Sequence, residues 1–394
     1  MSAKPLPPNF FHCPPLSRDE KQRFKEQGIA AAYELAENTQ LKGGPIKWEL
    51  DSNEHDLKIY MGKVAGTKYA AFSATPCLST IEIMGTMTEV FDLFRSQTTE
   101  EAKDYCRRFG KVLEDAVNLY SIVPVTPETP HEMVGISWRG FKPSVDKLVM
   151  RRDACLLDVH HAFEFNGKHV WVRCLKSVAL SCCPQLPGYV RMTHHCSGHI
   201  FSESDKPGYI DVSFIVHADA GGSVGDYASW IVDMTSRKRC RNLTDIDRFL
   251  RENRMSKTPF LKADKTKPVT LASSCYLCTR RFGPLSKKTN CLTCGEVCCR
   301  RCIRLWDVKN RGFDAQASVC TKCALGKPDN QKPSVWWRTS QSYTDESHFG
   351  SDGHTTPGSQ GSTTSSPKRL DLFELAVDAR VWSSKKQLQV TLGQ

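Results

Sequence analysis

The sequence contains no run that approaches the roughly 20 consecutive apolar residues a membrane-spanning helix requires. Its first residues, MSAKPLPPNFFHCPPLSRDE, lack the apolar core and the small-residue cleavage site of a secretory signal. We therefore expect a cytoplasmic chain, in which thiols stay reduced. Under that expectation the 18 cysteines indicate metal ligands and small core residues, because disulfides are rare in a reducing compartment.

Acidic residues are the scarcer charged type. The chain has 43 Asp and Glu against 54 Lys and Arg, for a net charge of +11. This balance favours acidic partners, namely nucleic acid, anionic lipid surfaces or acidic proteins. Nucleic acid is the least favoured of these partners. No predicted strand or helix alternates aromatic and basic residues, as a surface that binds nucleic-acid bases would.

Catalytic groups are also missing, since no nucleophile–base pair stands out in the sequence. The two adjacent histidine pairs, His160-His161 and His194-His195, fall in predicted strands, where neighbouring side chains point to opposite faces. The two histidines of a pair therefore cannot form a catalytic or metal site without further residues. His194 and His195 with Cys196 remain a weak alternative as metal ligands. We expect no enzymatic activity.

The first two thirds of the chain predict an α+β fold. Residues 1–16 are proline-rich and should be extended. Ser17 and Glu20 then form the capping box of a helix over 17–38. Short segments rich in β-branched and aromatic residues predict strands, interrupted by two short helices over 87–96 and 99–110. The predicted strands are 46–50, 56–64, 68–75, 79–87, 113–123, 131–141, 152–165, 168–180, 189–201 and 208–219.

A long helix is predicted over residues 225–254. Tyr227, Trp230, Ile231 and Met234 lie on one of its faces and should pack against the core. The element order indicates a curved antiparallel sheet with a terminal helix laid across it. The space between the helix and the sheet is either filled by side chains or left as an apolar cavity that suits a hydrophobic ligand.

Several motifs in residues 151–225 resemble the START lipid-binding domain, and the order of elements extends the resemblance over residues 17–254. It implies a helix-grip fold with a lipid-sized tunnel under the C-terminal helix. One departure is SVGDYASW after Gly222, where the family carries tryptophan and proline, and this affects the tunnel mouth. The matching residues are Ser177, Val178, Cys183, Pro184, Gly188, Tyr189, Val190, Arg191, Ser197, Gly198, His217, Asp219 and Gly222. Arg191 is either a buried ion-pair partner or a ligand contact.

A cysteine-rich segment follows, with four C-x2-C pairs separated by twelve, four and seventeen residues. Two thiolates at this spacing can hold one side of a tetrahedral zinc, so four pairs supply two closed sites. The segment is too small for a sufficient core, and metal binding should supply much of its folding free energy. The predicted ligands are Cys275, Cys278, Cys291, Cys294, Cys299, Cys302, Cys320 and Cys323. Cys298 falls outside the spacing and should pack as a hydrophobic residue.

Residues 275–323 resemble a FYVE zinc finger in the twelve-residue spacing, Phe282, the basic pair Lys287-Lys288 and the sequence Cys-Gly-x-Val. The resemblance implies cross-bracing, with the first and third cysteine pairs on one zinc and the second and fourth on the other. The two histidines and the arginine that follow the basic pair in that family are Thr289, Asn290 and Leu292 here. The donors for a specific phosphoinositide headgroup are therefore mostly gone.

Unspecific charge can still attract this segment to a membrane. Residues 256–325 carry fourteen Lys and Arg against four Asp and Glu, and the net charge with eight thiolates and two zinc ions is +6. We expect weak, headgroup-tolerant contact with an anionic membrane through Lys287, Lys288 and the apolar Leu285, or contact with a protein partner.

The last residues are compositionally distinct. Residues 339–367 contain 18 Ser, Thr or Gly among 29 and should be disordered, with a short helix expected at 368–380. Trp336 and Trp337 are expected to pack onto the zinc module. The predicted domain plan is a segment at 1–16, a START-like domain at 17–255, a basic linker at 256–270, a FYVE-like module at 271–326 and a tail at 327–394.

These features predict a non-enzymatic protein of the START–FYVE arrangement that binds, transfers or senses one lipid of unidentified class. It would be cytoplasmic and peripheral on endosomal or other anionic membranes. One alternative is an interaction scaffold whose START-like cavity is closed by side chains, since a fold alone does not define function. Another is a ubiquitin ligase, although the cross-braced modules of such enzymes usually include a histidine ligand and residues 275–323 contain none.

Overall fold

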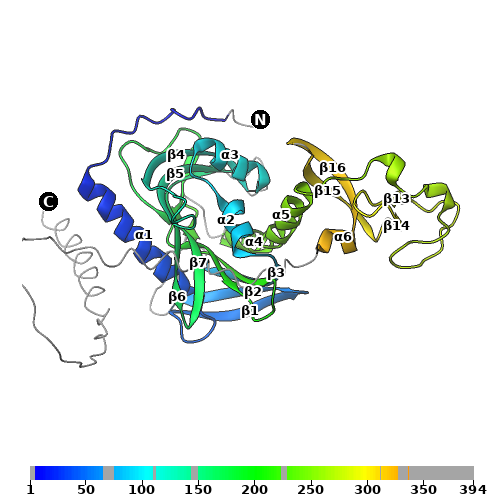
Figure 1. Ribbon diagram of the computed structural model, residues 1–394. Helices are drawn as coiled ribbons and strands as arrows, with labels where there is room; N and C mark the ends of the chain where they lie inside the picture. Colours follow the sequence, from blue (N-terminus) through cyan, green and yellow to red (C-terminus); the bar gives the residue numbers. More distant parts are fainter. Residues whose placement is uncertain are drawn as a thin grey trace, which may run out of the picture. The chain divides into compact units, whose positions relative to one another are not determined.

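The computed structural model describes residues 5–64, 75–109, 112–142, 150–222, 229–310, 312–326 and Trp336. A ten-stranded sheet dominates the N-terminal part of this range (Figure 1). Its strand order is β1-β2-β3-β11-β10-β7-β6-β5-β4, with antiparallel neighbours throughout, and β8 pairs in parallel with β6 off this path. The predicted α+β class, an antiparallel sheet combined with helices, is confirmed.

The strands follow the predicted segments closely. The segment predicted as one strand over 189–201 is divided into β8, β9 and β10, and most of the strand predicted over 68–75 lies outside the described residues. The bounds are β1 Ile46–Glu54, β2 Leu57–Val64, β3 Cys77–Met84, β4 Leu113–Val123, β5 Met133–Phe141, β6 Arg151–Phe165, β7 Lys168–Ser177, β8 Tyr189–Arg191, β9 Thr193–His194, β10 Ser197–Glu203, β11 Tyr209–Val216 and β12 Ala218–Asp219.

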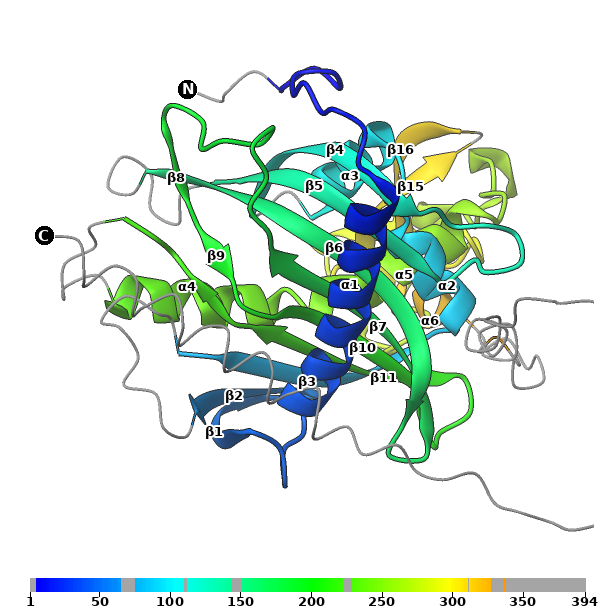
Figure 2. The same cartoon turned by 90° about the vertical axis from the view of Figure 1, so that its left-hand side faces the viewer.

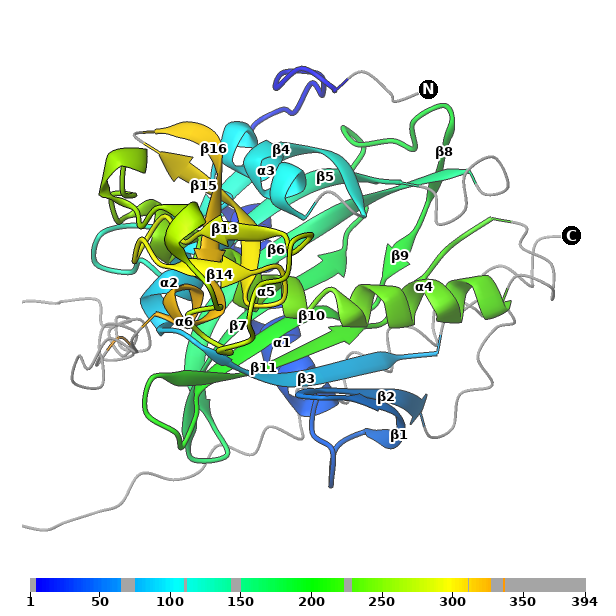
Figure 3. The same ribbon diagram turned by 90° about the vertical axis from the view of Figure 1, so that its right-hand side faces the viewer.

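Both faces of the sheet are covered. Helix α1 (Arg18–Asn38) crosses one face, as Figure 2 shows, and α4 (Ser229–Arg241) and α5 (Thr244–Ser256) cross the other, as Figure 3 shows. Because side chains alternate along a strand, each central strand feeds two cores. In β7, Val172 packs in the core under α1, whereas Trp171 packs in the core that α2 to α5 cover.

The predicted start of α1 is confirmed. The Ser17 hydroxyl accepts from the Glu20 backbone N–H, and the Glu20 carboxylate accepts from the Ser17 backbone N–H. The same signal opens α2 (Met87–Phe94) at Thr86 and α3 (Thr99–Arg108) at Thr98. The predicted hairpin after Phe165 is also present, with positive φ at both Asn166 and Gly167.

The predicted long helix over 225–254 is wrong in one respect, because the described part consists of two helices, α4 and α5. Between them the Asn242 N–H bonds to the Lys238 and Arg239 carbonyls, and the Leu243 N–H bonds to the Cys240 carbonyl. The bonds to Arg239 and Cys240 are i→i−3 contacts, and they tighten the chain into one 3₁₀-like turn. Asparagine favours such an end because its amide competes with the helix backbone.

The predicted core stripe on this helix is also wrong. Trp230 is 60% exposed and Met234 is 42% exposed, Ile231 is only partly buried, and Tyr227 lies outside the described residues. The buried positions of α4 are instead Ser236 and Cys240. The face that α4 turns toward the sheet is therefore small and polar, and it includes Arg239, which borders a cavity described below.

The cysteine-rich module comprises β13 (Lys288–Asn290), β14 (Val297–Cys299), β15 (Ile303–Asn310), β16 (Phe313–Cys320) and α6 (Thr321–Leu325). Two 3₁₀ turns, Ala263–Lys265 and Val269–Leu271, precede it. The residues predicted as a linker contact the module closely. The Leu261 N–H bonds to the Leu292 carbonyl, and the Lys267 N–H bonds to the Gly295 carbonyl.

Helix α5 contacts both the sheet and the cysteine-rich module. Leu250 packs in the sheet core, and Met255 packs in the core of the module. Glu252 accepts from the Asp307 backbone N–H at 3.3 Å, and the Ser256 hydroxyl accepts from the Lys309 backbone N–H at 2.9 Å. One helix is therefore part of two hydrophobic cores.

Trp336 does not pack where the sequence suggested. Its ring lies 5.6 Å from the Phe91 ring and 6.1 Å from the His131 ring, against the core of the sheet and not the cysteine-rich module. Its neighbour Trp337 and the predicted helix at 368–380 lie outside the described residues. Among the described helices, none combines the length and apolar character needed to cross a membrane.

Candidate functional site

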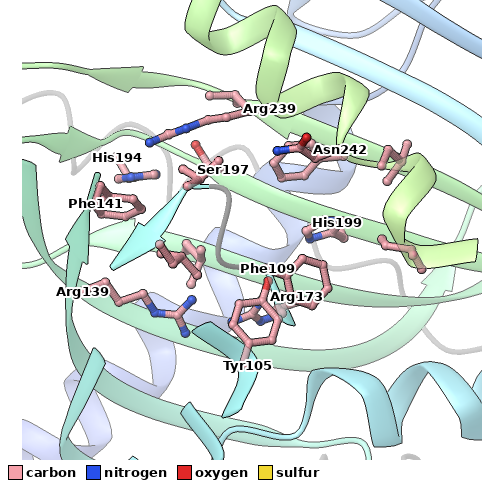
Figure 4. Close-up of a pocket in the computed structure, with 17 residues that line it drawn as sticks. Tyr105, Phe109, Arg139, Phe141, Arg173, His194, Ser197, His199, Arg239 and Asn242 are labelled. Carbon is pink, nitrogen blue, oxygen red and sulfur yellow. The ribbon is translucent and has the colours of Figure 1, made fainter. Parts of the chain in front are cut away.

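A cavity of about 110 Å³ lies between the sheet and the α4–α5 pair (Figure 4). Helix α3 and strands β4, β5, β7, β9, β10 and β11 complete its wall. Most of the lining is apolar, but among the described residues three arginines border the cavity and no carboxylate does. The lining residues are Tyr105, Phe109, Val112, Leu113, Arg139, Phe141, Arg173, Leu175, His194, Ser197, His199, Phe214, Val216, Arg239, Asn242, Leu243 and Ile246.

Two of the arginines share one buried carboxylate. Arg139 and Arg173 both donate to Asp158 behind the cavity wall, and Arg173 also donates to the Tyr105 hydroxyl at 2.8 Å. Burial alone would raise the pKa of Asp158, but Arg173 and Arg139 outweigh it and lower that pKa to about 2. The cluster keeps one positive charge in excess.

Arg239 differs from the other two arginines. Its Nε is buried, and within the described residues its side chain has no hydrogen bond or ion pair. The guanidinium carbon lies 5.1 Å from the Phe141 ring. Arg239 as a whole is partly buried. A cation–π contact of this kind contributes about 0.5–2 kcal/mol and does not replace the counter-charge that a buried ion ordinarily has. Burial accordingly lowers the pKa of Arg239 to about 10.

His194 lies on the same side of the cavity as Arg239 in Figure 4 and stacks on Phe141. It is 4% exposed, and both of its ring nitrogens lack a hydrogen-bond partner among the described residues. Burial first, and then the nearby Arg239 and Arg139, lower the pKa of His194 to about 3. His194 is therefore a neutral ring with one N–H free to donate.

None of these cavity residues was predicted as a lipid contact, and His194 entered the sequence analysis only as an alternative metal ligand. A signal was available, because Arg139 and Arg173 interrupt the apolar strand sequences SWRGF and WVRCL. An arginine at such a position is rarely buried without a partner. Arg239 gave no signal, because it lies in the basic run SRKRCR, which is typical of a solvated helix face.

A second, wider groove of about 590 Å³ lies beside α3 and the N-terminal segment. Its lining is mainly charged, with Lys103, Arg107, Arg108, Glu114, Asp115 and Lys142 among its residues. Charges of both signs are interspersed there, so the groove does not suit an apolar ligand.

The eight predicted cysteine ligands gather in two groups, each able to hold a metal ion. Within each group the sulfur atoms lie within 4.8 Å of one another. The grouping is the alternating one that the family resemblance implied. One group is Cys275, Cys278, Cys299 and Cys302, and the other is Cys291, Cys294, Cys320 and Cys323. Cys298 belongs to neither group and is buried in the core of the module.

The geometry of these groups fits zinc. Four thiolates at about 2.3 Å from a tetrahedral ion lie about 3.8 Å apart, and the Cys278 and Cys299 sulfurs are 3.7 Å apart. Backbone N–H groups donate to the sulfurs, for example from Cys320 to Cys291 at 3.3 Å. Burial would raise the pKa of Cys291, but these donors lower it to about 7, which favours the thiolate.

The three predicted membrane-contact residues differ in availability. Leu285 is 98% exposed, and Lys287 is exposed with no partner among the described residues. Lys288 is partly buried, because its ammonium donates to the Ala272 carbonyl at 3.0 Å and lies over the Phe282 ring.

Arg191 and the pair His160-His161, which the sequence analysis considered as candidate site residues, have structural roles. Arg191 forms two hydrogen bonds with the buried Asp153, at 2.8 and 2.9 Å, so it is an ion-pair partner and not a cavity residue. His160 and His161 point to opposite faces as predicted, with His160 near Trp171 and His161 bonded to Glu132. Within the described residues, histidine takes part in no group able to hold a metal.

The glycine at position 198, one of the residues that match the START motifs, is explained by steric constraints. A Cβ at this position would lie 2.0 Å from the Arg173 carbonyl oxygen on the neighbouring strand. Only glycine therefore allows β10 to approach β7 next to the cavity.

No protein-family model and no curated protein matches this chain. The solved structures similar to it are START or StAR-related lipid transfer domains. Human StAR-related lipid transfer protein 5 is 14% identical over 58% of this chain and 99% of its own, with a TM-score of 0.44. Human STARD10 is 10% identical over 60% and 80%, with a TM-score of 0.40. A STAR-related lipid transfer protein fragment from Xanthomonas axonopodis is 16% identical over 52% and 98%, with a TM-score of 0.38.

Proposed function

We propose that this protein is a non-enzymatic lipid-binding protein that holds one lipid between the sheet and the α4–α5 pair. The observation that carries the proposal is the mostly apolar cavity at this position, with a few convergent polar groups on its wall. The proposed role is lipid transfer or sensing in the cytoplasm.

The size of the cavity implies movement on binding. Its volume of about 110 Å³ is below the roughly 300–1,000 Å³ of pockets that hold drug-sized ligands. Full insertion of a lipid chain therefore requires the α4–α5 pair to move away from the sheet. The turn at Asn242 and Leu243 is a place where α4 could pivot relative to α5.

Native mass spectrometry tests the lipid proposal. The full-length protein, purified without chelator and incubated with mixed-lipid vesicles, is expected to carry one lipid-sized adduct that extracts into organic solvent. Absence of any adduct would contradict lipid binding and favour the alternative of an interaction scaffold with a closed cavity, which the small volume also fits.

For the cysteine-rich module we propose two structural zinc ions and weak contact with anionic membranes, with endosomal surfaces as one candidate location. Support comes from the two cysteine groups, the net positive charge and the exposure of Leu285 and Lys287. A zinc ion in each group would hold its four thiolates together, and no open ligand position would remain for chemistry. A protein partner remains the alternative occupant of this surface.

Vesicle sedimentation tests the membrane contact. The protein is expected to bind phosphatidylcholine vesicles that contain phosphatidylserine more strongly than phosphatidylcholine alone. Lys287→Ala should weaken that binding about fivefold, because one well-placed cation contributes about 1 kcal/mol. Lys42→Ala, at an exposed lysine outside the module, is the control. Equal binding to both vesicle types, or no effect of Lys287→Ala, would contradict the proposal. Substituting phosphatidylinositol 3-phosphate at equal charge should not increase binding.

A further inference from the structure

Charge in the cavity is unbalanced among the described residues. Arg139, Arg173 and Arg239 border it, Asp158 is the one carboxylate that meets any of them, and no acidic residue lines the wall. Asp158 is already shared by two of the guanidiniums. The cavity therefore keeps an excess of positive charge in a largely apolar setting, where an unpaired ion is costly.

The excess is concentrated at one end. Arg239 and His194 flank Phe141 there, with Ser197 beside them, as Figure 4 shows. The Ser197 hydroxyl is already engaged with the backbone of His217. Among the described residues at this end of the cavity, Arg239 and His194 therefore retain free donors, while the Nε of Arg173 lacks a partner elsewhere on the wall.

A role in packing alone does not explain Arg239. Helix α4 exposes the apolar Trp230 and Met234 to solvent and directs Arg239 inward. Exchanging these positions would bury apolar surface and hydrate the partly buried guanidinium more fully, and both changes would be favourable. An arginine that points inward at a cost in folding stability is typical of a side chain that contacts a ligand.

We propose that the ligand is an acidic lipid whose anionic head, a carboxylate or a phosphate, binds Arg239 and His194 while its chain lies against Phe109, Phe214 and Ile246. This inference rests on the proposed lipid-binding function and adds the class of lipid. The head accepts hydrogen bonds from the Arg239 guanidinium and from one N–H of the neutral His194 ring. It supplies the negative charge that the wall lacks.

The test compares four single-chain lipids of equal chain length bound to the full-length protein: a free fatty acid, a lysophosphatidic acid, a lysophosphatidylcholine and a monoacylglycerol. Affinities are measured by displacement of a fluorescent fatty acid and checked by native mass spectrometry. We expect one or both acidic lipids to bind at least about tenfold more tightly than the zwitterionic and neutral ones. The ranking of the two acidic lipids tells a carboxylate from a phosphate.

Arg239→Met keeps the length of the side chain and removes its charge. It should abolish the preference for the acidic lipids and leave the unliganded protein at least as stable in thermal unfolding. A merely structural Arg239 would instead make the variant less stable. Arg237→Met is the matched control on the same helix, because Arg237 pairs with Asp51 on the surface.

The outcomes separate the two proposals. If lipids bind equally regardless of charge, or if Arg239→Met leaves the preference intact, the acidic head is wrong and lipid binding stands. If none of the four lipids binds and vesicles yield no adduct, the lipid-binding function itself fails, and this inference fails with it.

Discussion

Replacing Cys291 with serine is expected to reduce the metal content from two ions to one and to unfold residues 271–326. Cys291 is buried and belongs to a group whose other members come from three different positions along the chain. Because the two groups alternate along the sequence, loss of one ion frees loops that the other cannot restrain. Apparent zinc-binding free energies of about 10–16 kcal/mol exceed what so small a core can supply.

Metal stoichiometry in native mass spectrometry measures this effect directly. Loss of the part of the near-ultraviolet circular dichroism that Trp306 contributes, identified by comparison with a Trp306→Phe variant, reports the unfolding, because Trp306 is buried in the module. Cys298→Ala is the matched control, since this cysteine is buried in the same module and belongs to neither group. Retention of two ions by Cys291→Ser, or loss of one by Cys298→Ala, would mean that the ligand assignment is wrong.

Replacing Asp158 with alanine should destabilise the protein by about 3–5 kcal/mol. The substitution leaves Arg139 and Arg173 buried without a counter-charge, and removal of one partner from a buried ion cluster is strongly destabilising. Asp211→Ala is the control, because within the described part of the chain this half-exposed carboxylate forms an ion pair only with Lys168, at 4.0 Å. Urea unfolding at neutral pH measures both variants, and a difference below about 1 kcal/mol would contradict the role assigned to Asp158.

The same carboxylate makes stability depend on pH. The pKa of Asp158 is about 2 in the folded protein, below its ordinary value of 3.8. Its contribution is therefore fully present above pH 3.8 and is lost as the pH falls toward 2. In the Asp158→Ala variant the free energy of unfolding should fall less steeply over that interval than in the wild type.

The sequence predicted the sheet well because the signal for a strand is local. Alternation along β6 and β7 fixes which side chains meet each face, and it correctly separated His160 from His161. Turn chemistry is local too, so the capping box at Ser17 and the hairpin at Asn166 were predictable. The spacing of the cysteines likewise identified the residues that the structure gathers into two groups.

The errors concern tertiary packing. The stripe of Trp230 and Met234 has the spacing of a core face, but periodicity does not say which face of α4 meets the sheet. The break at Asn242 depends on a single polar residue within an otherwise helical pattern. Arg239 was unpredictable for a further reason, because its isolation from any carboxylate depends on residues far away in the sequence.

The double role of α5 determines how this chain can be divided. A fragment that ends at residue 256 would keep Leu250 in the sheet core but leave Met255 facing water, with Glu252 deprived of the Asp307 N–H. A fragment that begins at residue 257 would open the core of the cysteine-rich module. Truncations at this boundary should therefore aggregate more readily and resist protease less well than the intact chain. The amino-acid composition of the chain changes near residue 256. In the structure this position lies in α5, the helix that belongs to both hydrophobic cores.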